Sequence, residues 1–204
     1  LNVNKLITNG YAMPSLTVSS MNWKLNEDIT IAGNLSLGSN TIDLNGCKLS
    51  VQGTVYQTGG TMFINGGQLI IEKDYRIENS GNYVNAVLNM TNEADYVKVG
   101  ETFSTYSYYH HAEYLTAGTM EIKGDFLERA NYYYSNSYYN FKASGNHKVI
   151  LSGNGAQKID FQYPGYSQFN ILEIKNPSSN VSFASSLNVN KLITNGYAMP
   201  SLTV

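Results

Sequence analysis

The stretch TIDLNGCKLSVQ at residues 41–52 is followed twenty positions later by TMFINGGQLIIE at residues 61–72. At this shift of 20, identical residues and apolar residues coincide: Thr41 with Thr61, Ile42 with Met62, Leu44 with Ile64, Asn45 with Asn65, Gly46 with Gly66 and Leu49 with Leu69. Within each copy apolar and polar residues alternate, which is typical of a short strand with one buried face. A two-residue alternation nested in a period of about 20 predicts a β-solenoid, in which each coil stacks on the previous one.

The Asn-Gly pair in each copy predicts a corner of the coil. Stacking would place Asn45 over Asn65 in a structural ladder of side-chain amides, and Gly46 over Gly66 would permit the left-handed backbone that such a corner requires. Asn-Gly is also the strongest short signal for a two-residue hairpin, so an antiparallel meander is the alternative. A meander gives no reason for strand and turn positions to share one register, and we therefore favour the solenoid.

The second half of the chain repeats the pattern with longer coils. YVKVGETF at residues 96–103 aligns with TMEIKGDF at residues 119–126 at a shift of 23. The next such strand is expected at Lys148–Leu151, a further shift of 29 along the chain. Additional strands are expected around residues 158–162, 169–174 and 181–183. The fold class is thus all-β, an elongated β-solenoid with uncapped ends, in which coils of about 20–25 residues give roughly eight or nine coils and about 40 Å of axis.

A second, much longer repeat frames the chain. LNVNKLITNGYAMPSLTV at residues 1–18 recurs unchanged at residues 187–204, a shift of 186. We interpret residues 1–186 as one repeat unit and residues 187–204 as the start of the next identical unit in the same body. On this interpretation the last coil offers the next unit the same edge that the first coil offers.

Three longer segments carry a resemblance to a known kind of protein: residues 33–75, residues 115–126 (LTAGTMEIKGDF) and residues 145–159 (GNHKVILSGNGAQKI). They resemble the repeats of very large, secreted cell-surface proteins of Gram-positive, spore-forming bacteria. The resemblance covers most of the unit and implies an extracellular, wall- or fibre-associated tandem-repeat protein with a β-solenoid body. It implies no established catalytic residues and identifies no ligand.

The composition excludes several classes of partner. Charged residues make up 14% of the chain, the formal net charge is −2, and Arg76 and Arg129 are the two arginines. Such a chain has no basic surface to follow a phosphate backbone, which argues against nucleic acid as a partner. No apolar run approaches the ~18 residues of a membrane span, so no membrane insertion is expected.

Several titratable residues are candidates for chemistry. Closely spaced carboxylates occur as Glu72 with Asp74, Glu93 with Asp95 and Asp125 with Glu128, and two adjacent histidines occur at His110 and His111. Carboxylate pairs carry out acid–base chemistry in β-helical polysaccharide enzymes. We interpret these pairs as charges at strand ends, and adjacent histidines in an extended segment point to opposite faces and do not share one ion. The sequence therefore predicts no enzyme, no metal and no cofactor.

Two tyrosine-rich insertions are the surface feature that suggests a function. They are YSYYHHAEY at residues 106–114 and YYYSNSYYNF at residues 132–141, and they hold Tyr106, Tyr108, Tyr109, Tyr114, Tyr132, Tyr133, Tyr134, Tyr138 and Tyr139. Such rings bind flat or polar surfaces at low entropic cost, but they also clad the side of a solenoid. Three interpretations remain open: structural cladding, lateral association between rods, and binding of a glycan or protein surface.

The sequence as a whole predicts a structural repeat module of an extracellular filament or surface stalk. Identical repeat units are the expected partners, end to end, and also side by side if rods associate laterally. A surface adhesin that acts through the tyrosine-rich loops is the alternative, and a β-helical carbohydrate-active enzyme is a weaker one.

Overall fold

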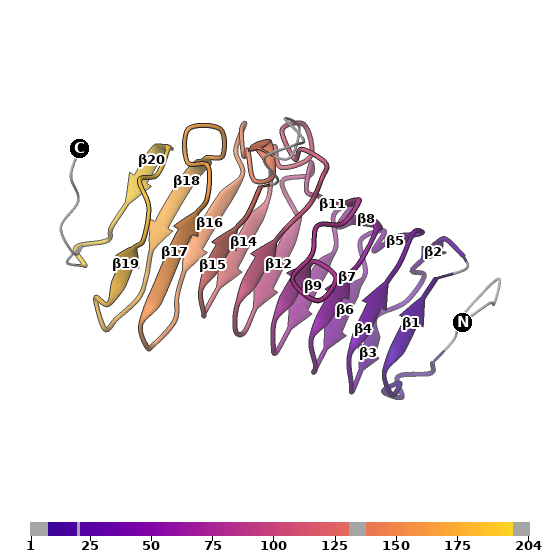
Figure 1. Cartoon of the computed structure of the whole chain (residues 1–204). Helices are drawn as coiled ribbons and strands as arrows, with labels where there is room; N and C mark the ends of the chain where they lie inside the picture. Colours follow the sequence, from indigo (N-terminus) through magenta and orange to yellow (C-terminus); the bar gives the residue numbers. More distant parts are fainter. Residues whose placement is uncertain (1–7, 20, 131–137, 198–204) are drawn as a thin grey trace.

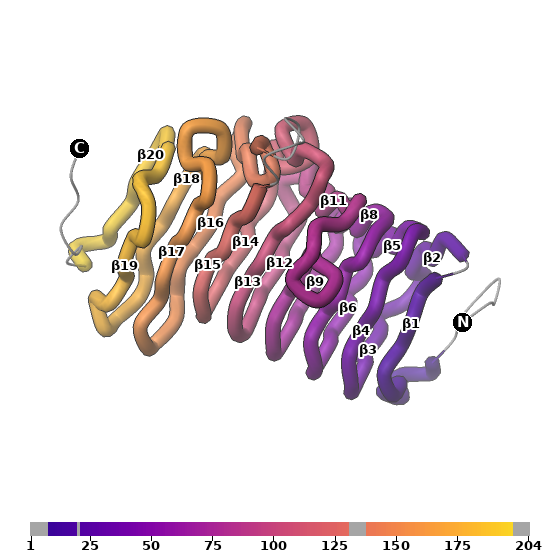
Figure 2. Tube along the Cα trace, in the orientation of Figure 1, coloured from indigo at the N-terminus to yellow at the C-terminus, as the bar shows by residue number. Residues whose placement is uncertain are grey.

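The short strands of each coil pair with the strands of the adjacent coils, and this pairing forms the sheets of the fold. The computed structural model describes residues 8–19, 21–130 and 138–197. The described chain winds as a β-solenoid whose coils stack along one axis, with the two ends of the chain at opposite ends of the stack (Figures 1 and 2). The predicted fold class is confirmed.

Three parallel sheets form the sides of the solenoid. Sheet I contains β1 (Leu16–Val18), β4 (Leu35–Leu37), β7 (Val55–Gln57), β10 (Tyr75–Ile77), β13 (Phe103–Thr105), β15 (Phe126–Glu128), β17 (Gln157–Phe161) and β19 (Val181–Phe183). Sheet II contains β2 (Trp23–Lys24), β5 (Thr41–Asp43), β8 (Gly60–Phe63) and β11 (Ala86–Asn89). Sheet III contains β3 (Ile29–Ile31), β6 (Lys48–Val51), β9 (Gln68–Ile71), β12 (Tyr96–Val99), β14 (Thr119–Ile122), β16 (Lys148–Leu151), β18 (Phe169–Ile174) and β20 (Val189–Ile193).

The strand register follows the shifts expected from the sequence. Leu49 lies opposite Leu69 at a shift of 20, Val97 opposite Met120 at a shift of 23, and Met120 opposite Val149 at a shift of 29. Each long sheet holds eight strands among the described residues, so seven steps of ~4.8 Å give about 34 Å of axis. The described residues thus form about seven turns, fewer than the eight or nine coils expected, because the insertions lengthen the coils.

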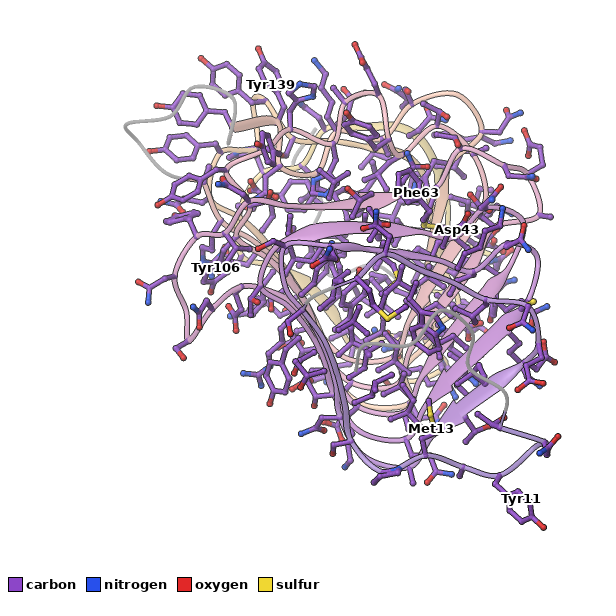
Figure 3. All side chains as sticks on the ribbon, turned by 90° about the vertical axis from the view of Figure 1, so that its right-hand side faces the viewer. Tyr11, Met13, Asp43, Phe63, Tyr106 and Tyr139 are labelled. Carbon is purple, nitrogen blue, oxygen red and sulfur yellow. The ribbon has the colours of Figure 1, made fainter. Side chains whose placement is uncertain are left out.

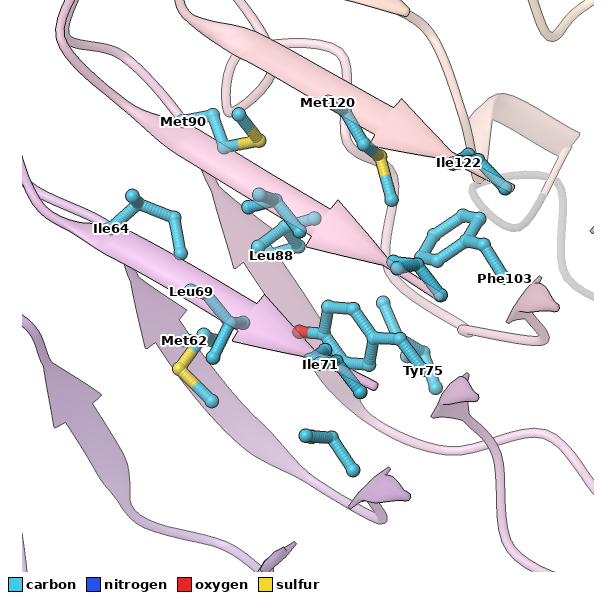
Figure 4. Close-up of a cluster of buried hydrophobic side chains, with 14 of the residues drawn as sticks. Met62, Ile64, Leu69, Ile71, Tyr75, Leu88, Met90, Phe103, Met120 and Ile122 are labelled. Carbon is cyan, nitrogen blue, oxygen red and sulfur yellow. The ribbon is translucent and has the colours of Figure 1, made fainter. Parts of the chain in front are cut away.

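Inward side chains from the three sheets form one continuous core. In strands such as β6, residues on one face are fully buried while their neighbours are partly exposed. Figure 4 shows part of this core, with Met62, Ile64, Leu69, Ile71, Tyr75, Leu88, Met90, Phe103, Met120 and Ile122 labelled. Because each coil buries its side chains against those above and below, the core is as long as the stack.

The Asn-Gly corners adopt the left-handed backbone that the sequence predicts. Asn45 and Gly46 have φ of 49° and 81°, and Asn65 and Gly66 have φ of 45° and 78°. The Gly46 N–H donates to the Asn65 carbonyl at 3.0 Å, so the corners stack through the backbone. The side-chain amides bond elsewhere: Asn45 Nδ2 donates to the Leu25 carbonyl, and Asn65 Nδ2 donates to Asp43 Oδ1. Asn45 and Asn65 thus bond to a carbonyl and a carboxylate of the preceding coil, and the predicted ladder between their side-chain amides does not form.

Sheet II ends at β11, where the tyrosine-rich insertions begin. Beyond it, single bridges between Met90 and Leu115 and between Lys142 and Gln168 continue this side of the solenoid. The loops that follow β13 and β17 gather along the top edge of the body in Figure 1. This side of the later coils is therefore formed mainly by insertions.

The two copies of the duplicated stretch share a local turn but lie in different places. Asn9 and Gly10 have φ of 50° and 79°, and Asn195 and Gly196 have φ of 52° and 78°. The first turn lies ahead of β3, where Thr8 bonds to the Glu27 carboxylate, whereas the second follows β20. The described parts of the two copies overlap at residues 8–11 and 194–197, so the interpretation of residues 187–204 as the start of an identical unit stays a prediction.

Candidate binding surface

The tyrosine-rich loops form one surface along the side of the solenoid that sheet II leaves open. Figure 3 shows Tyr106 and Tyr139 on the same side of the molecule, away from Asp43. Tyr132, Tyr133 and Tyr134 lie outside the described residues. We use the name tyrosine surface for Tyr83, Tyr106, Tyr108, Tyr109, Tyr138, Tyr139, Tyr163 and Tyr166.

One cluster of the tyrosine surface is centred on Tyr83. Its ring centroid lies 5.9 Å from that of Tyr106 and 5.5 Å from that of Tyr108. The Tyr83 hydroxyl donates to the Ala130 carbonyl at 2.6 Å, and burial raises the pKa of this phenol. These rings pack against one another in tilted arrangements that are favourable for aromatic pairs.

A second cluster lies further along the axis. The Tyr138 ring lies 4.7 Å from Tyr163 and 5.1 Å from Tyr166, and Tyr139 meets Tyr166 edge to face at 5.5 Å. Lys142 Nζ lies 4.5 Å from the centre of the Tyr139 ring, which places a cation over an aromatic face. A surface with aromatic faces and one cation can contact both apolar and anionic groups.

Exposure differs among these rings. Tyr109 is 50% exposed and Tyr166 is 45% exposed, whereas Tyr106, Tyr108, Tyr138 and Tyr139 are half-buried. Tyr114 is also half-buried and packs on His110 at 6.3 Å. Cladding therefore accounts for part of the tyrosine surface, and the two exposed rings are its accessible points.

Aromatic side chains in the core hold the second insertion in place. Phe141 is buried, and its ring lies 4.7 Å from Phe126 and 5.6 Å from Phe169. Phe126 in turn contacts Phe103 at 5.1 Å and Phe161 at 5.4 Å. Such pairs add about 0.5–1.5 kcal/mol each beyond the burial of their area. Phe141 thus anchors the second insertion in the core of the solenoid.

A buried polar network fixes both insertions. Thr105 Oγ1 donates to Asn140 Oδ1 at 2.6 Å, and Asn140 Nδ2 donates back to the Thr105 carbonyl at 3.1 Å. His111 contacts the Asn140 carbonyl through Nδ1, and its Nε2 accepts the Leu88 N–H at 3.1 Å. These contacts require a neutral imidazole protonated on Nδ1. Burial accordingly lowers the pKa of His111 to about 4.

A buried carboxyl group lies beneath the second cluster. Glu128, at the end of β15, is completely buried, and its Oε2 accepts the Gln162 N–H at 3.1 Å. Its Oε1 has no hydrogen-bond partner within the described ranges. Burial raises the pKa of Glu128 to about 7. The guanidinium of its neighbour Arg129 pairs instead with Asp160 at 2.8 Å.

Several carboxylates that were candidates for catalysis, Asp74, Asp95 and Asp125, accept hydrogen bonds from backbone N–H groups. Asp95 Oδ1 accepts the Gly66 N–H at 2.6 Å and Oδ2 accepts the Asn92 N–H at 3.0 Å, and Asp95 is buried. Asp125 Oδ1 accepts the Lys158 N–H at 2.7 Å. We expected solvated strand-end charges, but several of these carboxylates bond to backbone N–H groups of neighbouring coils. Across the described parts of the chain, no group of three or more metal-ligating side chains comes together.

Compared with known proteins, the chain matches no family model, no curated protein and no solved structure. No helix within the described residues is long and apolar enough to cross a membrane. A proposal for its function therefore depends on its own geometry.

Sequence reasoning missed three members of the tyrosine surface, namely Tyr83, Tyr163 and Tyr166. A signal was present, because Tyr83 precedes Tyr106 by 23 positions and Tyr138 precedes Tyr163 by 25, both within the range of coil lengths. These three tyrosines lie outside tyrosine runs, and stacking in the solenoid brings them to the surface that the runs form.

Proposed function

We propose that this chain is a structural repeat module of an extracellular filament or surface stalk, in which units stack end to end into a stiff rod. The supporting observation is that, in the described part of the chain, sheets I and III run through the whole body and end in strands that have no further strand beside them, at β1 and β19 and at β3 and β20. The outer edge of β3 holds a single bridge to Met13. Parallel sheets that end in open edges favour continuation by a similar coil. Stiffness then comes from backbone hydrogen bonds along the axis.

Apolar side chains at both ends support the same function. Met13, Leu16 and Met21 at one end, and Leu187 and Val189 at the other, pack on the core while remaining partly exposed. Leu192 is 36% exposed. In a rod, neighbouring coils would bury these side chains at about 25 cal/mol per Å² of apolar surface. A head-to-tail contact between such different ends does not close on itself, and it produces a filament.

Electron microscopy of the purified protein tests this proposal. We expect rods of uniform width with an axial repeat of about 40 Å, the length of one unit at ~4.8 Å per coil. A population of single particles that does not extend with rising protein concentration would contradict it.

The tyrosine surface favours a second candidate, a surface adhesin that binds glycan or protein. In a rod this surface would recur once per unit, so weak contacts would add through multivalency. Replacing Tyr109 and Tyr166 by Ser should abolish retention on a glycan array or lateral bundling of rods. Tyr11→Ser is the matched control, because Tyr11 is 78% exposed but lies at the lower edge of the molecule, away from Tyr106 and Tyr139 (Figure 3). Equal loss in the control, or no loss in the double variant, would contradict the adhesin.

We propose no enzymatic activity. Asp95 and Asp125 are engaged by backbone N–H groups, and Glu93 Oε1 accepts a hydrogen bond from Asn146 at 2.8 Å. Turnover of a polysaccharide that disappeared in the Glu93→Gln, Asp95→Asn variant would overturn this view. The resemblance to repeats of secreted surface proteins supports an extracellular location, which labelling of intact cells with an antibody to this chain would test.

A further inference from the structure

The outer edge of β20 has no strand beside it among the described residues, while β3 at the other end holds an irregular partner. The Met13 N–H donates to the Thr30 carbonyl at 2.8 Å, and the Ala32 N–H donates to the Met13 carbonyl at 2.6 Å. Met13 lies opposite Ile31 in a single parallel bridge, at a shift of 18. The shifts between neighbouring strands of sheet III are all larger, from 20 for β3 and β6 to 29 for β14 and β16. Met13 therefore occupies the position beside β3, and the coil that joins it to β3 is shorter than the other coils of sheet III.

The inward columns of sheet III define which residue β20 would place beside β3. One column runs through Ile29, Leu49, Leu69, Val97, Met120, Val149, Leu172 and Leu192. If β20 packs beneath the next β3 along the rod, Leu192 lies opposite the Ile29 of that strand. Because the units repeat at a shift of 186, this pairing has a shift of 23, which equals the shift between Val97 and Met120.

Among the described residues, the column is exposed at its Leu192 end. Leu192 is 36% exposed at one end, although the other members of the column are buried. At the other end Ile29 is already buried, although Tyr11, two residues before Met13, is 78% exposed. Pairing of β20 with β3 would bury Leu192 against Ile29 and so continue the column.

Charge on the outward face agrees with this register. Lys191 precedes Leu192 and Asp28 precedes Ile29, so the two lie opposite each other, and both are exposed. Glu27 is adjacent to Asp28 in the sequence and adds a second negative charge. Opposite charges on neighbouring strands contribute about 0.2–1 kcal/mol, and like charges are unfavourable.

We propose that β20 of one copy of this chain pairs in parallel with β3 of the copy that follows it along the rod, with Leu192 opposite Ile29, Lys191 opposite Asp28 and Ile193 opposite Thr30, displacing Met13 from that edge. This joint deepens the proposed function and rests on it. Its partner is a second copy of this sequence, either as the next unit of an array or as a separate molecule. The edge of β3 holds one partner at a time, because the Thr30 carbonyl and the Ala32 N–H serve either strand.

Disulfide trapping between separate molecules tests the register. In a Cys47→Ala background, Thr30→Cys and Ile193→Cys place two thiols on neighbouring parallel strands about 4.8 Å apart, within the Cα range that a disulfide spans. The matched control combines Thr30→Cys with Lys191→Cys, which shifts one thiol by two residues and separates the Cα atoms by about 8 Å. Circular dichroism first confirms that each variant keeps the β-sheet content of the parent chain.

Under mild oxidation we expect a ladder of covalent oligomers from the first pair, and at least tenfold less cross-linking beyond the dimer from the control pair. Each single-cysteine variant should stop at the dimer. Lys191→Glu should weaken assembly, and Asp28→Lys in the same chain should restore it.

Equal cross-linking by both pairs would overturn the register. Rods in the microscope without the cross-link between positions 30 and 193 would overturn this joint and leave the proposed function standing. The absence of both rods and cross-links would overturn both.

Discussion

Ionisation of Glu128 should destabilise the fold as the pH rises. The carboxyl group is completely buried, Oε1 has no partner among the described residues, and burial raises its pKa from 4.5 to about 7. Between these two values the folded state binds more protons than the unfolded state, so stability falls with increasing pH. The difference between the two pKa values corresponds to a destabilisation of about 3 kcal/mol. This loss of unfolding free energy is absent below pH 4.5 and complete above about pH 8.

Urea denaturation of the parent chain and of Glu128→Gln, from pH 4.5 to 8.5, measures this contribution. The amide stays neutral, so the difference in unfolding free energy between the two proteins should shift by about 3 kcal/mol in favour of the variant across this range. His111 and His147 are present in both proteins, and their contributions cancel. Glu113→Gln is the control, because Glu113 is exposed. Parallel stability curves for the parent chain and Glu128→Gln would refute the reasoning.

Four other substitutions have expected outcomes. Phe126→Ala should destabilise the fold by about 3–5 kcal/mol in urea denaturation, because the ring is fully buried among four other aromatic rings; a cost no larger than that of Leu127→Ala, on the outward face, would contradict this. His147 is buried with both ring nitrogens unpartnered in the described structure, and burial lowers its pKa to about 3. The unfolded state therefore binds more protons below pH 6.5, and stability should fall as the pH is lowered from 6.5 towards 3, whereas His147→Leu should show a shallower decline. Gly46→Ala should cost about 1 kcal/mol, because φ is +81° and the added Cβ meets nothing within 4 Å. Gly60→Ala should cost clearly more in thermal denaturation, because its Cβ would lie 1.8 Å from a backbone carbonyl oxygen, and equal melting temperatures would contradict this.

Much of the fold could be predicted from the sequence because stacking makes the register periodic. Leu49 and Leu69 occupy the same inward position in successive coils, and selection for a continuous apolar column leaves this period in the sequence. The left-handed corners at Asn45–Gly46 and Asn65–Gly66 follow from residue chemistry alone. The three strands expected after residue 157 also lie where the alternation placed them.

The tyrosine surface could be predicted only in part from the sequence. The runs at residues 106–114 and 132–141 indicate where tyrosines gather, but not which rings are exposed. Tyr166 joins them through a loop of another coil, and Phe141 turns inward to the core. Such contacts between coils depend on the path of each insertion, which has no periodic signal.

The sequence by itself determined the solenoid, its coil lengths and its corners, because these depend on local backbone preference and on the periodic burial of apolar side chains. Tertiary structure alone decided which polar groups lose their contact with water. It buried Glu128 and His147, left Tyr109 and Tyr166 in solvent, and gave the identical turns at residues 8–11 and 194–197 different neighbours. The physical reason is that burial and pairing are properties of what surrounds a residue, and identical sequences meet different surroundings at the two ends of the stack.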